Sequence, residues 1–420
     1  MRNMNGVIGL GLAAIALACA TTAAGPGAAA GSKAPASTPP LAAAPPGPAA
    51  SLDPKAALTR LFSASLPAPE WFAPSFLAAV PLARITALAK RFRAQYGAYK
   101  GVSAEGGQWV VGFERGSLGA DVSLDEGGRF VGLMLHPRDA TVPTIGEAIA
   151  DFRALPGKVS VLVQSDGKDV GSFDADDALA VGSTFKLATL ATLRADIDAH
   201  RRSWRDIVEL RSANRSLPSG VLQSWPDGAP LTVYSLAALM ISLSDNTATD
   251  TLIRLVGRDA IQPLASRNRP YLTTRELFVL KSPGNDDLLR RFREADEVKR
   301  RALLPELDQR ALPAPAAYPT APTALDVEWF FTARELCHLM GLVHDLPFMG
   351  INVGGLARDD WDHVAYKGGS EPGVLNMTTW VEKGPHQHCV SATWNATQPL
   401  EPLEFTVAYS RLLSWLKSHP

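Results

Sequence analysis

The stretch that decides the fold of this chain is Val181-Gly182-Ser183-Thr184-Phe185-Lys186-Leu187-Ala188-Thr189-Leu190. A serine opens a run of apolar, helix-forming residues, and a lysine follows it three positions later. On a helix, positions i and i+3 share one face, so the Lys186 amine can lie beside the Ser183 hydroxyl. Ser183 would also stand at the amino end of the helix, where free N–H groups and the macrodipole favour negative charge. The stretch therefore predicts a serine nucleophile whose reaction builds an oxyanion.

Two other serine-x-x-lysine sequences occur in the chain. Ser165-Asp166-Gly167-Lys168 is predicted to be a turn between two strands, because Asp-Gly is turn chemistry. Ser414-Trp415-Leu416-Lys417 lies at the end of the last predicted helix. Only Ser183 is followed by a long, largely apolar helical run.

The composition is that of a globular protein with room for two domains. The chain has 420 residues, of which 46% are hydrophobic, and a formal net charge of −1. A net charge this close to zero does not indicate binding to nucleic acid or to an anionic membrane. The three cysteines are too few for a disulfide framework. Cys337 and Cys389 can pair if the chain is exported, or they can be two buried free thiols.

The amino-terminal end is typical of an exported protein. Residues 1–24 combine Arg2, a short apolar run and small residues, which predicts a signal peptide. Ala16-Leu17-Ala18-Cys19 resembles a lipoprotein cleavage box, so Cys19 is a candidate lipid anchor; cleavage near Ala24 is the alternative. We therefore expect a periplasmic or lipid-anchored protein. Residues 25–51 are almost all Ala, Pro, Gly and Ser, which predicts a tether.

The remaining sequence divides into a small and a large domain. Residues 52–140 predict helices followed by an antiparallel meander of three strands, a small α+β domain. Residues 141–420 predict two strands, many helices including 324–342, three more strands and a closing helix. The sheet of this larger domain must unite strands from both ends of its sequence. The charged and then Pro/Ala-rich stretch 281–322 is expected to be an excursion on the surface.

Two later stretches offer side chains for the same chemistry. Leu243-Ser244-Asp245-Asn246-Thr247 supplies a second hydroxyl and an amide, although by itself it is also an ordinary helix cap. Tyr366-Lys367-Gly368-Gly369-Ser370 places a lysine at a strand end, where glycines let a ligand approach the backbone. By itself this second stretch is a glycine pair beside a hairpin.

Serine-x-x-lysine, Ser-Asp-Asn and Lys-(Thr/Ser)-Gly, in this order, are the signature of penicillin-recognising serine hydrolases. Over residues 141–420 the chain resembles the class A β-lactamase-like superfamily. The small first domain and the sequence Lys-Gly-Gly-Ser-Glu-Pro-Gly at 367–373 also resemble the two-domain β-lactamase-like proteins of clavulanic-acid gene clusters. The resemblance implies an α+β chain with an NTF2-like (steroid-isomerase-like) first domain. The second would be a β-lactamase/D,D-peptidase-like domain, an antiparallel sheet packed with helices.

The resemblance implies catalytic roles for four residues. Ser183 is the acylated nucleophile, and Lys186 is its base or helps to orient its hydroxyl. Ser244 passes a proton to the leaving nitrogen. Lys367 binds the substrate carboxylate and keeps the site positive. For Lys186 to act as a base its pKa must fall towards neutrality, which burial and the second ammonium of Lys367 both favour.

The same resemblance assigns substrate binding to Asn246, Gly368, Gly369 and Ser370. The backbone N–H groups of Ser183 and Ser370 would form the oxyanion hole. Gly368 departs from the family pattern, because a threonine or serine usually follows this lysine. One hydroxyl contact to the substrate carboxylate is therefore missing.

A second departure concerns the release of the acyl group. Class A enzymes place a Glu-x-x-Leu-Asn loop between the Ser-Asp-Asn motif and a Thr-Thr-x helix start, for which Thr273-Thr274 is the candidate here. No such loop occurs between Asn246 and Thr273. Glu276 is predicted to be a first-turn helix acid rather than a replacement base. We therefore expect faster acylation than deacylation.

These observations predict an exported serine hydrolase that acts on β-lactams or related amides or esters. The alternatives are a D,D-peptidase, an esterase, or a penicillin-binding or sensor module without turnover. The substrate would be a small molecule or a peptidoglycan-like peptide, with no cofactor. His386 and His388 share one face of a strand, but no third ligand has suitable spacing, so no metal is expected.

Overall fold

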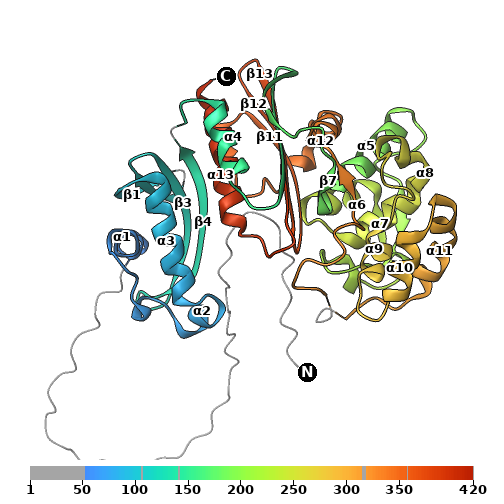
Figure 1. The fold of residues 1–420 in the computed structure, drawn as a ribbon, viewed down its shortest axis with the longest axis horizontal. Helices are drawn as coiled ribbons and strands as arrows, with labels where there is room; N and C mark the ends of the chain where they lie inside the picture. Colours follow the sequence, from blue (N-terminus) through green and yellow to red (C-terminus); the bar gives the residue numbers. More distant parts are fainter. Residues whose placement is uncertain (1–52, 106, 141, 315–317, 357, 420) are drawn as a thin grey trace, which may run out of the picture. The chain divides into compact units, whose positions relative to one another are not determined.

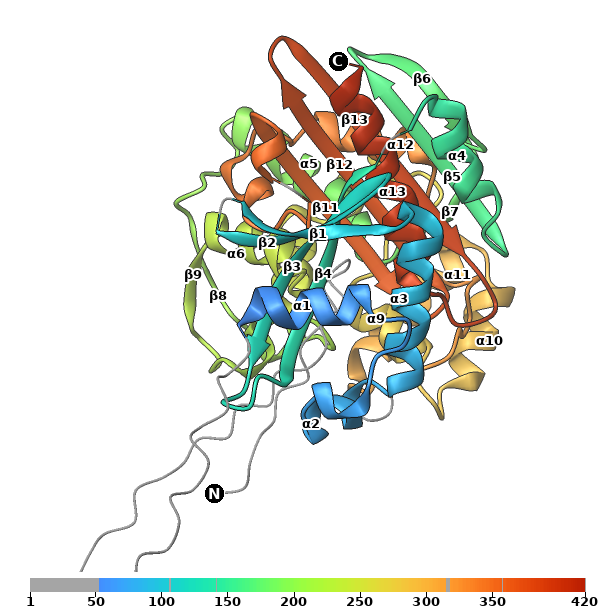
Figure 2. The same ribbon diagram turned by 90° about the vertical axis from the view of Figure 1, so that its left-hand side faces the viewer.

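The computed structural model describes residues 53–105, 107–140, 142–314, 318–356 and 358–419. The predicted signal peptide with Cys19 and the predicted tether over 25–51 lie outside these residues. The described chain forms two compact units, 53–139 and 140–419 (Figures 1 and 2). Every described helix is too short or too polar to cross a membrane.

The first unit is a helical layer on a four-stranded antiparallel sheet of order β1-β2-β3-β4. Its elements are α1 (Pro54–Ser63), η1 (Pro69–Trp71), α2 (Pro74–Ala79), α3 (Leu82–Tyr96), β1 (Tyr99–Glu105), β2 (Gln108–Phe113), β3 (Gly116–Leu124) and β4 (Phe130–Ala140). The aromatic rings of Phe62 on α1 and Phe113 on β2 meet edge to face, 5.7 Å apart, inside this core. The predicted α+β architecture is confirmed. Strand β1 was not predicted, because only its Val102 is buried and its sequence lacks the alternation of a half-buried strand.

The second unit contains a five-stranded antiparallel sheet of order β11-β12-β13-β5-β6. The strands are β5 (Lys158–Ser165), β6 (Lys168–Phe173), β11 (His363–Glu371), β12 (Val374–Lys383) and β13 (His386–Asn395). β13 pairs with β5, so the sheet joins the two ends of the unit's sequence, as predicted. Helices α4 (Ile145–Arg153) and α13 (Pro402–Ser418) cover one face (Figure 1).

Alternation along β5 sorts the side chains between the two faces of this sheet. Val161 and Val163 join the core under α4 and α13, whereas Leu162 faces α12 (Ala333–Gly341) on the other side. Cys389 on β13 also faces α12, and a disulfide joins it to Cys337 there, with 5.8 Å between the two Cα atoms. The structure thus decides between a disulfide and free thiols in favour of the disulfide.

The opposite face of the sheet carries a large helical region. Besides α12 it contains η2 (Gly182–Phe185), α5 (Lys186–Asp198), η3 (Ser212–Asn214), η4 (Leu222–Ser224), α6 (Val233–Ser242), α7 (Asn246–Val256), α8 (Arg258–Ile261), η5 (Gln262–Leu264), α9 (Thr274–Leu280), α10 (Asp286–Glu294), α11 (Glu297–Gln309) and η7 (Pro347–Gly350). Two short ribbons complete it: β7 (Leu179–Ala180) with β10 (Phe330–Phe331), and β8 (Ile207–Glu209) with β9 (Pro230–Thr232). The short turn η8 (Arg358–Asp360) instead contacts α13, where Asp360 pairs with Lys417.

Two predictions on this region were wrong. The stretch 281–322, expected to be a surface excursion, contains helices α10 and α11. Helix α10 buries Leu288, Leu289 and Phe292, whose spacing gives it one apolar face despite its many charges. The helix expected over 324–342 begins only at Ala333, because Thr332 caps it and the preceding Phe330–Phe331 pairs as a strand.

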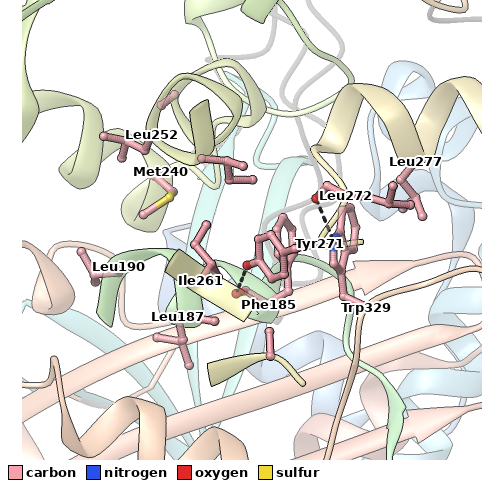
Figure 3. Close-up of a cluster of buried hydrophobic side chains, with 14 of the residues drawn as sticks. Phe185, Leu187, Leu190, Met240, Leu252, Ile261, Tyr271, Leu272, Leu277 and Trp329 are labelled. Carbon is pink, nitrogen blue, oxygen red and sulfur yellow. Dashed lines mark hydrogen bonds between the residues drawn. The ribbon is translucent and has the colours of Figure 1, made fainter. Parts of the chain in front are cut away.

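Helix α5 is the centre of the helical region. All its residues from Lys186 to Leu193 are buried, so it is surrounded by other elements rather than lying on the surface. Figure 3 shows Leu187 and Leu190 of this helix in the same cluster as Met240 and Leu252 from the helices around it. A helix enclosed in this way holds the residues at its amino end in fixed positions.

Candidate active site

Ser183 lies in the 3-10 turn η2, directly before α5. It is partly exposed, whereas Gly182 and Thr184 on either side of it are buried. Phe185 anchors the turn in the core, because its ring stacks on Trp329 with 3.8 Å between centroids. The Tyr271 hydroxyl donates to the Phe185 carbonyl over 3.0 Å (Figure 3). These buried contacts present the Ser183 side chain at the surface of a rigid core.

The Ser-Asp-Asn stretch forms the connection between α6 and α7. Ser244 has a φ of 53°, a left-handed conformation that costs a non-glycine residue about 1–3 kcal/mol. Asp245 holds this connection in place. One carboxylate oxygen caps α7 by accepting from the Ala248 N–H at 2.8 Å. The other accepts from the N–H groups of Val221 and Leu222, at 2.6 and 2.9 Å. Asp245 therefore caps α7, as this stretch can do by itself, and it also ties the connection to the 221–222 segment.

Two lysine ammonium groups meet at Ser244. Lys186 Nζ donates to the carbonyl and to Oγ of Ser244, at 2.6 and 3.0 Å, and to Oδ1 of Asn246 at 2.7 Å. Lys367 Nζ reaches the same Oγ at 3.1 Å and the carbonyl of Gly368 at 2.6 Å. The structure therefore brings the three sequence motifs together around one serine hydroxyl.

The environment lowers the pKa of both lysines. Complete burial lowers the pKa of Lys186 to about 7, although the negative charges of Asp245, Asp250 and Glu371 oppose the change. Burial also lowers the pKa of Lys367 well below its usual value, and the neighbouring charge of Lys186 lowers it further. A large fraction of Lys186 is therefore unprotonated at neutral pH and able to accept a proton.

Strand β11 runs against the Ser183 turn at Gly369. A Cβ on Gly369 would stand 2.0 Å from the Val181 carbonyl oxygen and 2.7 Å from the Ser183 nitrogen, so only glycine fits. Gly182 is matched to this approach, because its own Cβ would lie 3.0 Å from the Ser370 nitrogen. The close approach places the peptide of Ser370 beside that of Ser183, the arrangement that a two-amide oxyanion hole requires.

The structure also explains why glycine follows Lys367. A Cβ on Gly368 would stand 2.3 Å from the hydroxyl oxygen of Tyr366, and one on Gly354 would be as close to the same ring. Tyr366 is buried, and it fills the space that a threonine or serine side chain would need at 368. The departure from the family pattern is thus a packing consequence of Tyr366.

Glu276 is committed to the structure of α9, as predicted. Thr273 and Glu276 form a reciprocal capping box, and the fully buried Glu276 carboxylate accepts two bonds from Arg258, at 2.8 and 3.2 Å. A carboxylate that accepts three hydrogen bonds from Thr273 and Arg258 is poorly placed to activate water.

The sequence interpretation missed Asp250, which lies one turn after Asn246 on α7. Its carboxylate is fully buried and accepts from both N–H and Oγ1 of Thr274 and from the N–H of Arg275, at 2.7–2.9 Å. Burial raises its pKa to about 7. Its four-residue spacing from Asn246 was a readable signal, because it places the two on one helix face.

The remaining candidates lie on other elements. Ser165 ends β5, and Ser414 is buried on α13, so neither belongs to this cluster. His386 pairs with Asp166, with 2.8 Å between Nδ1 and Oδ2. Among the residues that the structure describes, no three His, Cys, Asp or Glu side chains gather as metal ligands would.

Comparison with known proteins gives one sequence match. Residues 144–292 match the model of a family described as the Beta-lactamase enzyme family. This segment holds Ser183, Lys186, Ser244 and Asn246, so the second unit is β-lactamase-like there. No curated protein matches the chain.

Several solved structures are similar to the chain. The β-lactamase from Sphaerobacter thermophilus has 20% identity, covering 66% of this chain and 97% of that one, with a TM-score of 0.47. A β-lactamase from Xanthomonas campestris has 14% identity, covering 65% and 96%, with a TM-score of 0.44. A PBP-A mutant in an acyl-enzyme complex with penicillin G has 13% identity, covering 66% and 96%, with a TM-score of 0.44.

Proposed function

We propose that this chain is an exported serine hydrolase that acts on β-lactams or related amides or esters through an acyl-enzyme at Ser183. The observation that carries the proposal is the convergence of Lys186 and Lys367 on Ser244 Oγ, beside the Ser183 turn. The β-lactamase-like match over 144–292 supports it.

The acylation step follows from this geometry. Neutral Lys186 takes the proton of Ser183 as its Oγ attacks the substrate carbonyl. The N–H groups of Ser183 and Ser370 stabilise the oxyanion, and each such donor contributes about 3 kcal/mol. Ser244 passes a proton to the leaving nitrogen, with Lys186 and Lys367 in contact with its hydroxyl. Asn246 and the glycine backbone of β11 position the substrate, whose carboxylate is bound by Lys367.

Slow deacylation belongs to the same proposal. Slow deacylation is expected because the Glu-x-x-Leu-Asn sequence is missing and because Glu276 is already engaged by Thr273 and Arg258. An acyl-enzyme that forms readily and hydrolyses slowly would also serve a D,D-peptidase or a penicillin sensor. An esterase would turn over activated esters with the same residues.

Export rests on the signal-like residues 1–24, with Cys19 as the candidate lipid attachment site. The Cys337–Cys389 disulfide supports it, because disulfides persist mainly in oxidising compartments. The NTF2-like assignment of the first unit rests on the resemblance to the two-domain proteins of clavulanic-acid gene clusters. Detergent partitioning of the mature protein tests the anchor, and Cys19→Ala should release it into the aqueous phase.

A fluorescent penicillin tests the nucleophile. Ser183→Ala should abolish covalent labelling, whereas Ser165→Ala and Ser414→Ala, which alter the two other serine-x-x-lysine sequences, should leave it intact. Labelling that survives Ser183→Ala would refute the assignment. An unlabelled wild-type protein that still binds penicillin would favour the non-covalent binding module.

A further inference from the structure

Three buried charged side chains meet at the end of β11. Lys281, the residue that follows α9, donates to Oε1 of Glu328 and, at 3.0 Å, to Oε2 of Glu371. The exposed fractions of these side chains are only 6%, 0% and 11%, respectively. The acylation step described above uses none of the three.

The register of β11 aims Glu371 at the active site. Side chains alternate along a strand, so Lys367, Gly369 and Glu371 share one face. On this face Lys367 reaches Ser244, and Gly369 lies against the Ser183 nitrogen. Glu371 follows Gly369 by one repeat, about 7 Å along the strand. Lys367 and Glu371 therefore lie on opposite sides of the nucleophile.

The two carboxyl groups are arranged to share a proton. Burial raises the pKa of Glu328, and the adjacent charge of Glu371 raises it further. As a carboxylate, Glu328 leaves Oε2 without a hydrogen-bond partner among the described residues; when protonated, it can donate to Glu371. Two carboxyls in contact commonly hold one proton, which leaves the other ionised.

A cavity of about 150 Å³ lies next to this pair, lined by Glu328 together with the arginines 267, 269, 293 and 300. A polar cavity of this size has room for several water molecules. The Glu328 side chain itself is fully buried.

We propose that Glu371 is the general base that activates water for hydrolysis of the Ser183 acyl-enzyme, where the family's Glu-x-x-Leu-Asn loop is missing. This inference rests on the proposed acyl-enzyme. Water gives a proton to Glu371, and its oxygen forms a bond to the acyl carbonyl carbon. The bond from that carbon to Ser183 Oγ then breaks, and Oγ takes back from the Lys186 ammonium the proton that Lys186 accepted during acylation. Glu371 releases its proton to solvent, and Lys186 is left neutral, the form that the next acylation uses.

The ion pair with Lys281 engages Oε2 of Glu371 at 3.0 Å, so one of the two carboxylate oxygens of the proposed base is already occupied. The role of Glu371 is therefore compatible with slow deacylation, and it gives the residual turnover a defined chemical origin.

The test measures acylation and deacylation separately in the Glu371→Gln variant. Intact-mass spectrometry follows the rate at which the benzylpenicillin adduct forms and the rate at which it is lost. Adduct formation should stay within a few-fold of wild type, and adduct loss should slow by about 10²-fold or more. Glu328→Gln keeps the Lys281–Glu371 pair and should slow adduct loss less. Glu335→Gln, at the start of α12, is the matched control and should change neither rate.

Each other outcome has a defined meaning. Adduct loss at the wild-type rate in Glu371→Gln would overturn the role of Glu371. The role would also be overturned if Glu371→Gln and Glu328→Gln both lost adduct formation and thermal stability to the same extent. That result would show that the cluster of Lys281, Glu328 and Glu371 is purely structural. If Glu371→Gln does not fold, Glu371→Asp keeps a charge for Lys281 and must still release the adduct more slowly than wild type. A wild-type protein that forms no adduct would instead refute the proposed function.

Discussion

Lys186 and Lys367 donate to the same oxygen, Ser244 Oγ, at 3.0 and 3.1 Å. Two ammonium groups this close repel each other, and the pKa values of both are lowered, so the arrangement favours the loss of a proton from the pair. The proposal gives the proton-accepting role to Lys186, because its position follows Ser183 by three residues. The unfavourable conformation of Ser244, with φ at 53°, is the backbone cost of presenting its hydroxyl to both lysines.

The first prediction concerns the pH dependence of acylation. The pKa of Lys186 is lowered to about 7, so the neutral amine predominates above pH 7 and becomes scarce below it. The rate of labelling by a penicillin should therefore rise with pH through about 7 and then level off. It should fall about tenfold per pH unit on the acid side. A rate that does not change between pH 5 and 8 would contradict Lys186 as the base.

Removal of the amine is the second prediction. Lys186→Met keeps most of the length of the side chain but not the base, so acylation should slow by about 10²- to 10⁴-fold. Lys168→Met alters the exposed lysine of another serine-x-x-lysine sequence and should leave labelling unchanged. Equal labelling of the two variants would show that Lys186 takes no proton.

The third prediction tests the close approach of β11 to the nucleophile. In Gly369→Ala the new Cβ would meet the backbone of Val181 and Ser183, so strand and turn must separate. Weakening the oxyanion hole should slow acylation by about 10²- to 10³-fold. Gly101→Ala, whose Cβ enters open space on β1, is the control. Wild-type labelling by Gly369→Ala would rule out this contact as a requirement.

Stability gives the fourth prediction. Trp329 is almost fully buried and stacks on Phe185 beneath the nucleophile, so Trp329→Ala should lower the free energy of unfolding by about 3–5 kcal/mol. Trp225, which is 41% exposed, is the control. Trp225→Ala should lower the free energy of unfolding by no more than about 0.5 kcal/mol. Denaturant titration measures both. Similar losses would show that the Phe185 stack contributes little.

The disulfide gives the fifth prediction. It joins cysteines 52 positions apart, and its removal in Cys337→Ser should cost about 2–5 kcal/mol. Reduction of the wild-type protein should lower the thermal midpoint similarly, and penicillin labelling of folded protein should persist because the bond lies away from Ser183. An unchanged midpoint under reducing conditions would argue against the bond.

The sequence predicted those parts of the site that depend on short-range patterns. Ser183 and Lys186 lie on one turn, and Ser244 and Asn246 on one connection, so local spacing was enough to nominate them. That Lys186 donates to Ser244 and Asn246 depends on how α5 and α7 pack, which a single sequence does not reveal.

The rest of the site depends on contacts between distant segments. Lys281, Glu328 and Glu371 come from three separate elements, and no spacing in the sequence joins them. The stretch 281–322, which begins with Lys281, was misread because the charges of α10 obscured its apolar face, which holds Leu288 and Phe292. Strand β11 was predicted to end near Lys367, but pairing with β12 carries it on to Glu371.

The central claim is a long-lived acyl-enzyme at Ser183. Its most direct test is intact-mass spectrometry of the wild-type protein mixed with a small excess of benzylpenicillin and followed over time. The account predicts one added penicillin per chain within the first turnover, which disappears slowly and is absent in Ser183→Ala. Steady hydrolysis at about 10 per second or faster with no accumulated adduct, or an adduct retained in Ser183→Ala, would contradict it.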